Sequence, residues 1–179
     1  MGYWNTRGLR GSLLEEMLNL TNDRYRQRGL AVIQKIPTPI TPVQVDNSDR
    51  IISKAYFGEK STVDYIGVAQ GTALCFDAKQ TDRTSLPMQN IHSHQMDFMA
   101  AFEKQGGVSF LLVNFTADDA FYFLPFADLE RRWNAVRVGG RKSIPRDDFQ
   151  KEYRVESGNG FPLHYLEALN VYLGKANAK

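Results

Sequence analysis

Two aspartates stand on neighbouring segments that the sequence predicts to be paired strands. The segments span residues 61–68 and 73–79. In each of them the apolar residues alternate with polar ones or form a short run, and both patterns are typical of strands. A two-residue hairpin turn at Gln70-Gly71 places Asp64 directly across from Asp77. Opposed side chains have Cβ atoms only about 4.5–5.5 Å apart, so the two carboxylates repel one another unless a cation lies between them.

The paired aspartates predict a divalent-metal site for phosphodiester hydrolysis. Mg²⁺ and Mn²⁺ prefer hard oxygen ligands, and Asp64 and Asp77 would supply them. Lys79 points to the same face as Asp77, because side chains alternate along a strand. A metal supplies a Lewis acid and an activated water, and an ammonium group stabilises charge on a phosphate. Thr62 adds a backbone or hydroxyl oxygen; the alternative is a surface hairpin with unrelated charges.

A helix beginning at Ser12 brings a third acid towards this hairpin. Leu14, Leu18 and Tyr25 recur at helical spacing and form its inward-facing stripe. Ser12 and Glu15 have the spacing of a capping box, with Ser12 as the N-cap. Glu15 also lies at the edge of the inward stripe, so it either only caps the helix or faces the metal site.

The remaining apolar segments predict an α/β domain with a mixed central sheet flanked by helices. The expected strands cover residues 30–36, 108–115 and 120–124, and the expected helices cover residues 89–105, 126–136 and 161–173. Gln95 is a polar residue on an apolar helical stripe, so its amide bonds either to backbone or, through water, to the carboxylate site. His92 and His94 are too far apart around such a helix to share a metal ion, which favours hydrogen-bonding roles over zinc.

A proline-rich segment, residues 37–42, precedes a second hairpin pattern. Three prolines exclude a helix or central strand there and favour an extended path. Residues 43–57 contain a turn cluster flanked by apolar residues, which predicts a stalk that projects from the body and carries Arg50 and Lys54. An ordinary edge hairpin is the alternative.

Length and composition predict one folded domain over residues 1–179, with a flexible arm at 1–10 and a flexible tail at 175–179. The single cysteine, Cys75, excludes an internal disulfide, and its place in a strand favours a small buried residue over a reactive thiol. The chain has neither an apolar run of about 18 residues nor a signal peptide. We therefore expect a soluble, cytoplasmic protein with no membrane partner.

The distribution of charge favours a phosphate-bearing partner. The net charge is only +2, but residues 130–154 carry eight Lys or Arg and only four acids. Basic clusters of this kind supply the sequence-independent part of nucleic-acid binding. A solvated helix face is the alternative interpretation.

Short blocks in a fixed order extend through about three quarters of the chain. They are Leu14-Glu15 with Asn19 and Thr21-Asn22, Ala31-Val32-Ile33, Lys35, Pro37-Thr38-Pro39, Ala55-Tyr56-Phe57, Ser61-Thr62-x-Asp64-Tyr65-x-Gly67, Phe76-Asp77-Ala78-Lys79, Thr84-Ser85-x-Pro87-x-Gln89-Asn90-x-His92-x-His94-Gln95, Phe123-Leu124 and Gly140-Arg141-Lys142-Ser143-Ile144. In these blocks the chain resembles the RecU-type Holliday junction resolvases of Gram-positive bacteria and their phages, within the PD-(D/E)xK nucleases.

The resemblance implies a restriction-endonuclease-like fold with a projecting stalk hairpin. It implies a Mg²⁺- or Mn²⁺-dependent endonuclease that resolves Holliday junctions by paired nicks during recombination and repair. The implied partners are four-way junction DNA, a second copy of the chain in a homodimer, and a recombinase. The family's metal and catalytic positions fall on Thr62, Asp64, Asp77, Lys79 and Gln95, with Glu15 as an upstream acid. The implied DNA contacts are Lys35, Arg50, Lys54, Tyr56, Phe57, Arg141 and Lys142.

Two positions depart from the family pattern. The family usually has glutamate where this chain has Asp77, and a basic stalk residue falls at Asn47, although Arg50 is near. The first departure keeps open a non-catalytic protein that binds junctions or modulates a recombinase. A sequence-specific restriction-type nuclease is a further alternative with the same site and a different substrate.

Overall fold

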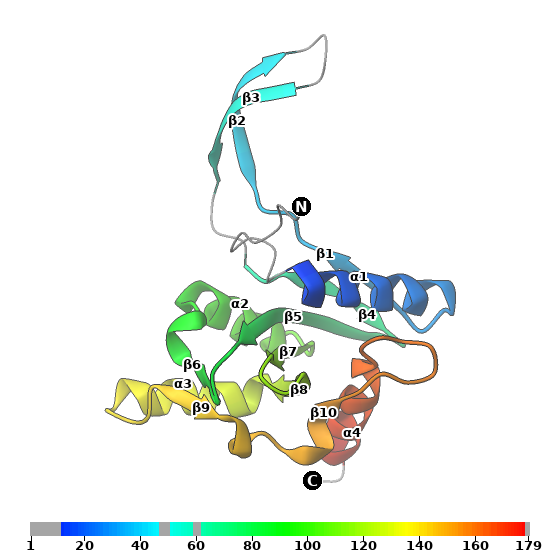
Figure 1. Ribbon diagram of the computed structural model, residues 1–179, viewed down its shortest axis with the longest axis vertical. Helices are drawn as coiled ribbons and strands as arrows, with labels where there is room; N and C mark the ends of the chain where they lie inside the picture. The colour runs from blue at the N-terminus through cyan, green and yellow to red at the C-terminus, as the bar shows by residue number, and fades with distance from the viewer. Residues whose placement is uncertain (1–11, 47–50, 59–61, 178–179) are drawn as a thin grey trace, which may run out of the picture.

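The structure is a computed structural model that describes residues 12–46, 51–58 and 62–177. The helices are α1 (Ser12–Gln27), α2 (Ser93–Lys104), α3 (Phe126–Arg137) and α4 (Tyr165–Asn177) (Figure 1). The strands of the main sheet are β1 (Ala31–Lys35), β4 (Tyr65–Ala69), β5 (Thr72–Thr81), β7 (Val108–Phe115), β8 (Ala120–Pro125) and β10 (Arg154–Val155). The predicted arm, residues 1–10, lies outside the described residues.

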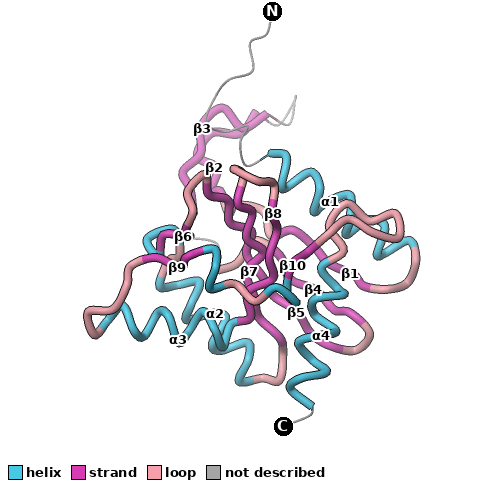
Figure 2. Tube along the Cα trace, turned by 60° about the horizontal axis from the view of Figure 1, so that its bottom comes forward, coloured by secondary structure: helices cyan, strands magenta, loops and turns pink. Residues whose placement is uncertain are grey.

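The central sheet has six strands in the order β1-β4-β5-β7-β8-β10. β5 and β7 are parallel and the other neighbours are antiparallel, which confirms the predicted mixed sheet. Because side chains alternate along each strand, β5 and β7 contribute to two cores. One core packs against α1 and α4, and the other packs against α2 and α3 (Figure 2). None of the helices in the described ranges is both long and apolar enough to cross a membrane.

Several boundaries differ from the predicted ones. The predicted helix 89–105 is interrupted: Met88–Asn90 forms a 3₁₀ helix, His92 is extended, and α2 begins at Ser93. The last helix begins at Tyr165 instead of residue 161 and continues to Asn177, so the first three residues of the predicted tail are helical. Two three-residue strands, β6 (Ser85–Pro87) and β9 (Ser143–Pro145), pair with each other. Segments this short carry no periodicity from which the sequence could predict them.

The predicted stalk is a separate two-stranded sheet. Its strands β2 (Ile40–Asp46) and β3 (Ile51–Phe57) pair with each other and project from the body (Figure 1). The stalk therefore starts at Ile40, three residues earlier than expected. The Gly58 N–H donates to the Pro39 carbonyl at 2.8 Å and closes its base. Register irregularities follow Pro42, which lacks the N–H that a regular ladder uses.

Cys75 is a buried side chain of β5 with 0% exposure, in agreement with the expected structural role. Its Sγ lies 3.3 Å from the Ser109 hydroxyl. Burial raises the pKa of the Cys75 thiol to about 12, so the nucleophilic thiolate is scarce at neutral pH. The residue belongs to the core that β5 shares with α2 and α3.

Gly67 lets β1 pack closely against β4. A Cβ at this position would lie 2.1 Å from the Val32 carbonyl oxygen and 2.7 Å from the Ile33 Cα. We expect Gly67→Ala to lower the free energy of unfolding by about 1–3 kcal/mol, because backbone atoms of β1 must move. Gly174→Ala in α4 is the matched control, since nothing lies within 4 Å of the added Cβ and alanine favours a helix. Urea denaturation measures both; equal effects at the two positions would contradict this account.

Candidate active site

The hairpin register places the two aspartates together as predicted. β4 and β5 pair from Ala69↔Thr72 to Tyr65↔Phe76, so the next opposed positions are Asp64 and Asp77. The Asp64 backbone N–H donates to Asp77 Oδ1 at 2.7 Å. In return, the Ala78 N–H donates to Asp64 Oδ2 at 3.1 Å. The two carboxyl groups are thus fixed against each other by backbone donors of the same strand pair.

The surrounding elements hold the two acids at different depths. Asp77 lies within β5, inside the central sheet, and its exposure is 0%. Asp64 directly precedes β4 and is half-buried. Its carbonyl accepts a hydrogen bond from the Ile36 N–H at 2.8 Å, which ties it to the end of β1 where the chain leaves for the stalk. Asp77 is therefore rigidly placed, and Asp64 is the more accessible partner.

Lys79 and Gln95 both contact the buried acid. Lys79 Nζ lies 2.8 Å from Asp77 Oδ2, and the Lys79 side chain is 15% exposed. Gln95, at the first turn of α2, donates from Nε2 to the same oxygen. Its Oε1 accepts the His92 N–H at 3.0 Å. Gln95 thus makes both predicted bonds at once, to backbone and to the carboxylate, and the second is direct instead of through water.

The histidines flanking Gln95 do not take the predicted arrangement. His92 precedes α2 instead of lying within it, so helical spacing does not separate it from His94. The two rings stack with centroids 5.4 Å apart and an interplanar angle of 12°. The expectation that they point far apart is wrong, and the interrupted helix is the reason.

The electrostatics of Asp64 agree with two acids forced together. Burial raises the pKa of the Asp64 carboxyl above its usual range, and the neighbouring Asp77 raises it further. The Ala78 N–H, Lys79 and Lys35 act in the opposite direction. Asp64 Oδ1 has no hydrogen-bond partner among the described residues. One carboxylate oxygen is therefore left for a cation.

Glu15 and Thr62 stand outside this pair. Glu15 forms an ion pair with Lys35, and both side chains are partly exposed. Thr62 is exposed two residues before Asp64. Within the part of the chain that the structure describes, no three acids, histidines or cysteines cluster as an all-protein metal cage would. The donor set still fits Mg²⁺, which commonly uses one or two carboxylates together with water and substrate phosphates.

The Asp64–Asp77 repulsion predicts an unusual stability effect. We expect Asp64→Asn to raise the free energy of unfolding of the metal-free protein by about 0.5–2 kcal/mol, because it removes a destabilising charge at a functional site. Asparagine keeps an oxygen for the Ala78 N–H. Thermal unfolding in a chelator measures the effect. Asp148→Asn is the control, since Asp148 pairs with Arg132 at 2.9 Å; a similar loss of stability in both variants would refute the repulsion.

The predicted DNA contacts are spread over several surfaces. Tyr56 and Phe57 on β3 are 61% and 85% exposed, and Lys54 beside them is also exposed. Arg50 lies outside the described residues. Arg141 and Lys142 follow α3 and are exposed. Figure 1 shows β3 and the segment after α3 far apart, at the top and at the lower left of the view, so the described residues among these contacts do not form one patch.

The basic stretch is partly neutralised by acids of its own surface. Four of its eight cations form ion pairs: Arg131 with Asp128, Arg132 with Asp148, Arg146 with Asp118, and Arg154 with Glu156. The solvated-surface interpretation therefore holds for half of the stretch. Arg141 and Lys142 are among the cations for which the described residues supply no acid.

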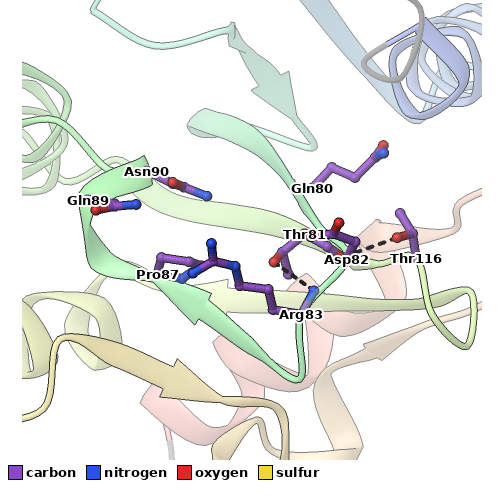
Figure 3. A pocket seen from close by; sticks show the side chains of 8 residues that line it. All are labelled: Gln80, Thr81, Asp82, Arg83, Pro87, Gln89, Asn90 and Thr116. Carbon is purple, nitrogen blue, oxygen red and sulfur yellow. Dashed lines mark hydrogen bonds between the residues drawn. The ribbon is translucent and has the colours of Figure 1, made fainter. Parts of the chain in front are cut away.

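A polar cavity near the end of β5 was missed by the sequence analysis. It has a volume of about 430 Å³. Gln80, Thr81 and Arg83, which follow Lys79 in the chain, are among its lining residues (Figure 3). Gln89 and Asn90 enter from the 3₁₀ helix before α2. No local sequence pattern signals that the amides of Gln89 and Asn90 face the residues just after Lys79.

A mixed sheet with two facing acids and a lysine beside the buried one is typical of nucleases of the PD-(D/E)xK class. The comparison with protein families gives the particular one: the family described as Recombination protein U, RecU, matches residues 9–171. The chain belongs to the RecU family.

Curated relatives agree over almost the whole chain. Proteins named Holliday junction resolvase RecU are 42% identical in Levilactobacillus brevis, 44% in Leuconostoc citreum and 41% in Geobacillus kaustophilus. These alignments cover 93%, 96% and 87% of this chain and 85%, 85% and 78% of the relatives. A solved structure of the Holliday junction resolvase Hjc from Archaeoglobus fulgidus is similar over 74% of this chain and 90% of its own, with 10% identity and a TM-score of 0.42, too low to carry any argument.

Proposed function

We propose that this protein is a Mg²⁺- or Mn²⁺-dependent, structure-selective endonuclease that resolves Holliday junctions by paired nicks during recombination and repair in the cytoplasm. One observation carries the proposal. Asp64 and Asp77 are hydrogen-bonded across an antiparallel strand pair, and Lys79 Nζ lies 2.8 Å from Asp77 Oδ2. Family membership and the names of the relatives support junction DNA as the substrate.

Each residue of the site has its own role in hydrolysis. Asp64 and Asp77 would hold the metal, with Thr62 supplying a further oxygen, and a bound metal supplies a Lewis acid and an activated water. The Lys79 ammonium stabilises negative charge on the phosphate. Gln95 holds the Asp77 carboxylate in place by its hydrogen bond. Its role as a metal ligand remains a prediction, because its amide oxygen accepts the His92 N–H.

Two features suit a branched substrate. A four-way junction has pairs of strands related by two-fold symmetry, so a homodimer would place its two active sites on two symmetry-related strands. The stalk would enter the centre of the junction, where exposed Tyr56 and Phe57 can contact bases. Lys35, Lys54, Arg141 and Lys142 would contact phosphates.

The decisive experiment compares a synthetic four-way junction with a linear duplex of the same sequence, with Mg²⁺, Mn²⁺ or a chelator. We expect metal-dependent, symmetric nicks in the junction and little cutting of the duplex. High junction affinity without cutting in either metal would favour a non-catalytic junction-binding protein, the alternative that Asp77 in place of the family's usual glutamate keeps open. Equal cutting of both substrates would indicate a restriction-type nuclease.

A further inference from the structure

A second cavity, of about 510 Å³, lies between α3 and the β6–β9 pair. We call it the α3 groove and define it by six of its lining residues: Met88, Trp133, Val136, Arg83, Arg137 and Lys142. In Figure 1 the β6–β9 pair and α3 lie below α2, on the opposite side of it from the stalk. Neither a stalk residue nor Asp64 or Asp77 is among the residues that line the groove.

A glycine turn brings together two of the three cations of the groove. After α3 ends at Arg137, the Gly140 N–H donates to the Ala135 carbonyl at 2.8 Å and the chain reverses. Gly139 has φ +91°, and a Cβ on Gly140 would lie 2.6 Å from the Ala135 oxygen, so this reversal requires glycine. The Lys142 carbonyl then accepts the Met88 N–H at 3.0 Å. Lys142 is therefore fixed beside the same groove as Arg137.

The groove carries uncompensated positive charge. Arg83, Arg137 and Lys142 form no ion pair with any acid in the described ranges, in contrast to the paired arginines nearby. No acidic side chain is among the described residues that line the groove. Three unpaired cations around one cavity favour an anionic ligand.

The shape of the groove adds a second requirement. Met88 and Val136 form an apolar side, and the Trp133 ring is only partly buried beside them. A bare phosphate would leave this apolar surface exposed to water. A nucleotide satisfies both halves of the groove, because its base has an apolar π-face and its phosphates are anionic. A cavity of about 510 Å³ suits one small ligand and is too small to hold a DNA duplex.

The groove adjoins the polar cavity at the end of β5. It shares Arg83, Pro87 and Gln89 with the polar cavity. Figure 3 shows Arg83 and Pro87 on one side of that cavity, with Gln80 across from them. Gln80 directly follows Lys79 on β5. The two cavities are therefore neighbouring hollows, lined from Gln80, the residue after Lys79, to Trp133.

We propose that the α3 groove binds an unpaired nucleotide of the DNA strand that passes through the active site. The base packs against Trp133, and its flanking phosphates contact Arg83, Arg137 and Lys142. The inference rests on the proposed function for the identity of the nucleic acid. It adds a contact on the body of the protein that holds the cleaved strand independently of the stalk.

Tryptophan fluorescence tests the proposal directly. The chain has two tryptophans, so Trp4→Phe leaves Trp133 as the only one. We expect an octathymidine oligonucleotide, added without divalent metal, to quench Trp133 emission. With a labelled octathymidine and fluorescence anisotropy as the readout, since these variants lack the reporter, Trp133→Leu should weaken the affinity about 5- to 100-fold and Trp133→Phe much less, because phenylalanine retains a stacking face. Arg137→Gln and Lys142→Gln should each reduce the slope of log affinity against log salt by about one.

Lys151→Gln is the matched control, since it removes an exposed cation of the same basic stretch that does not line the groove. Absence of quenching, or equal effects of Arg137→Gln and Lys151→Gln, would overturn the proposal, and an anionic peptide would then fit the groove better. The exposed Arg137 and Lys142 variants keep the test valid if Trp133→Leu does not fold. If octathymidine quenches Trp133 emission but the protein never cuts junctions, the proposed function is refuted and this inference still stands.

Discussion

Asp77→Asn is expected to reduce junction cleavage about 10³-fold or more while leaving junction affinity almost unchanged. Asparagine has the same shape, and its oxygen can still accept the Asp64 N–H that now bonds Asp77 Oδ1 at 2.7 Å. It removes the negative charge that Lys79 contacts and that a metal requires. Loss of a single member of a catalytic set typically costs factors of this size. Single-turnover cleavage of a labelled junction, together with a gel-shift titration, measures both quantities.

Two further variants make this result specific. Asp77→Glu restores the family's usual residue and keeps the charge, so we expect reduced but measurable cleavage. Asp23→Asn changes an exposed acid on α1 that pairs with Arg26 and should cut like the wild type. Wild-type cleavage by Asp77→Asn would show that the paired aspartates are not the active site.

Removal of the stalk is expected to abolish the preference for junctions. β2 and β3 pair only with each other, and Tyr56 and Phe57 are exposed, so the sheet and both cores remain intact without them. Pro39 and Gly58 are already hydrogen-bonded, which allows a short Gly-Ser linker to replace residues 40–57. We expect junction affinity to fall about 100-fold, the loss of two stacked bases at about 1–3 kcal/mol each. Affinity for a linear duplex should change little.

The control for the stalk deletion is the stability of the body. Its melting temperature should remain close to that of the full chain, as measured by circular dichroism. The double variant Tyr56→Ala with Phe57→Ala should lose part of the junction affinity without any change in chain length. An unchanged ratio of junction to duplex affinity in the deletion variant would exclude the stalk as the element that recognises the branch.

The sequence predicted the placement of Asp64, Asp77 and Lys79 because residues close to them in the chain determine it. Gln70 and Gly71 have φ of +47° and +85°, which suits the tight turn that fixes the register of β4 and β5. That register alone brings Asp64 beside Asp77 and places Lys79 on the same face. The helices and core strands were likewise predicted from apolar spacing.

The remaining features depend on contacts between distant segments. Gln95 meets Asp77 because α2 packs across β5, and nothing near Gln95 in the sequence specifies that distance. The interruption of the helix before Ser93 and the pairing of β6 with β9 are decided by tertiary hydrogen bonds, such as that from Met88 N–H to Lys142. The α3 groove has the same origin, since its cations come from two separate segments, Arg83 before β6 and Arg137 and Lys142 around the turn after α3.

One continuous hairpin with a two-residue turn sets the positions of Asp64, Asp77 and Lys79 relative to one another. Side chains on a strand have a period of two, so insertion of one residue at Gln70-Gly71 would invert β4 relative to β5 and separate the two acids. Such an insertion would leave the composition and the other helices untouched. The chemistry of the whole domain is therefore vulnerable to a single added codon in a surface turn, where proteins usually tolerate changes in length.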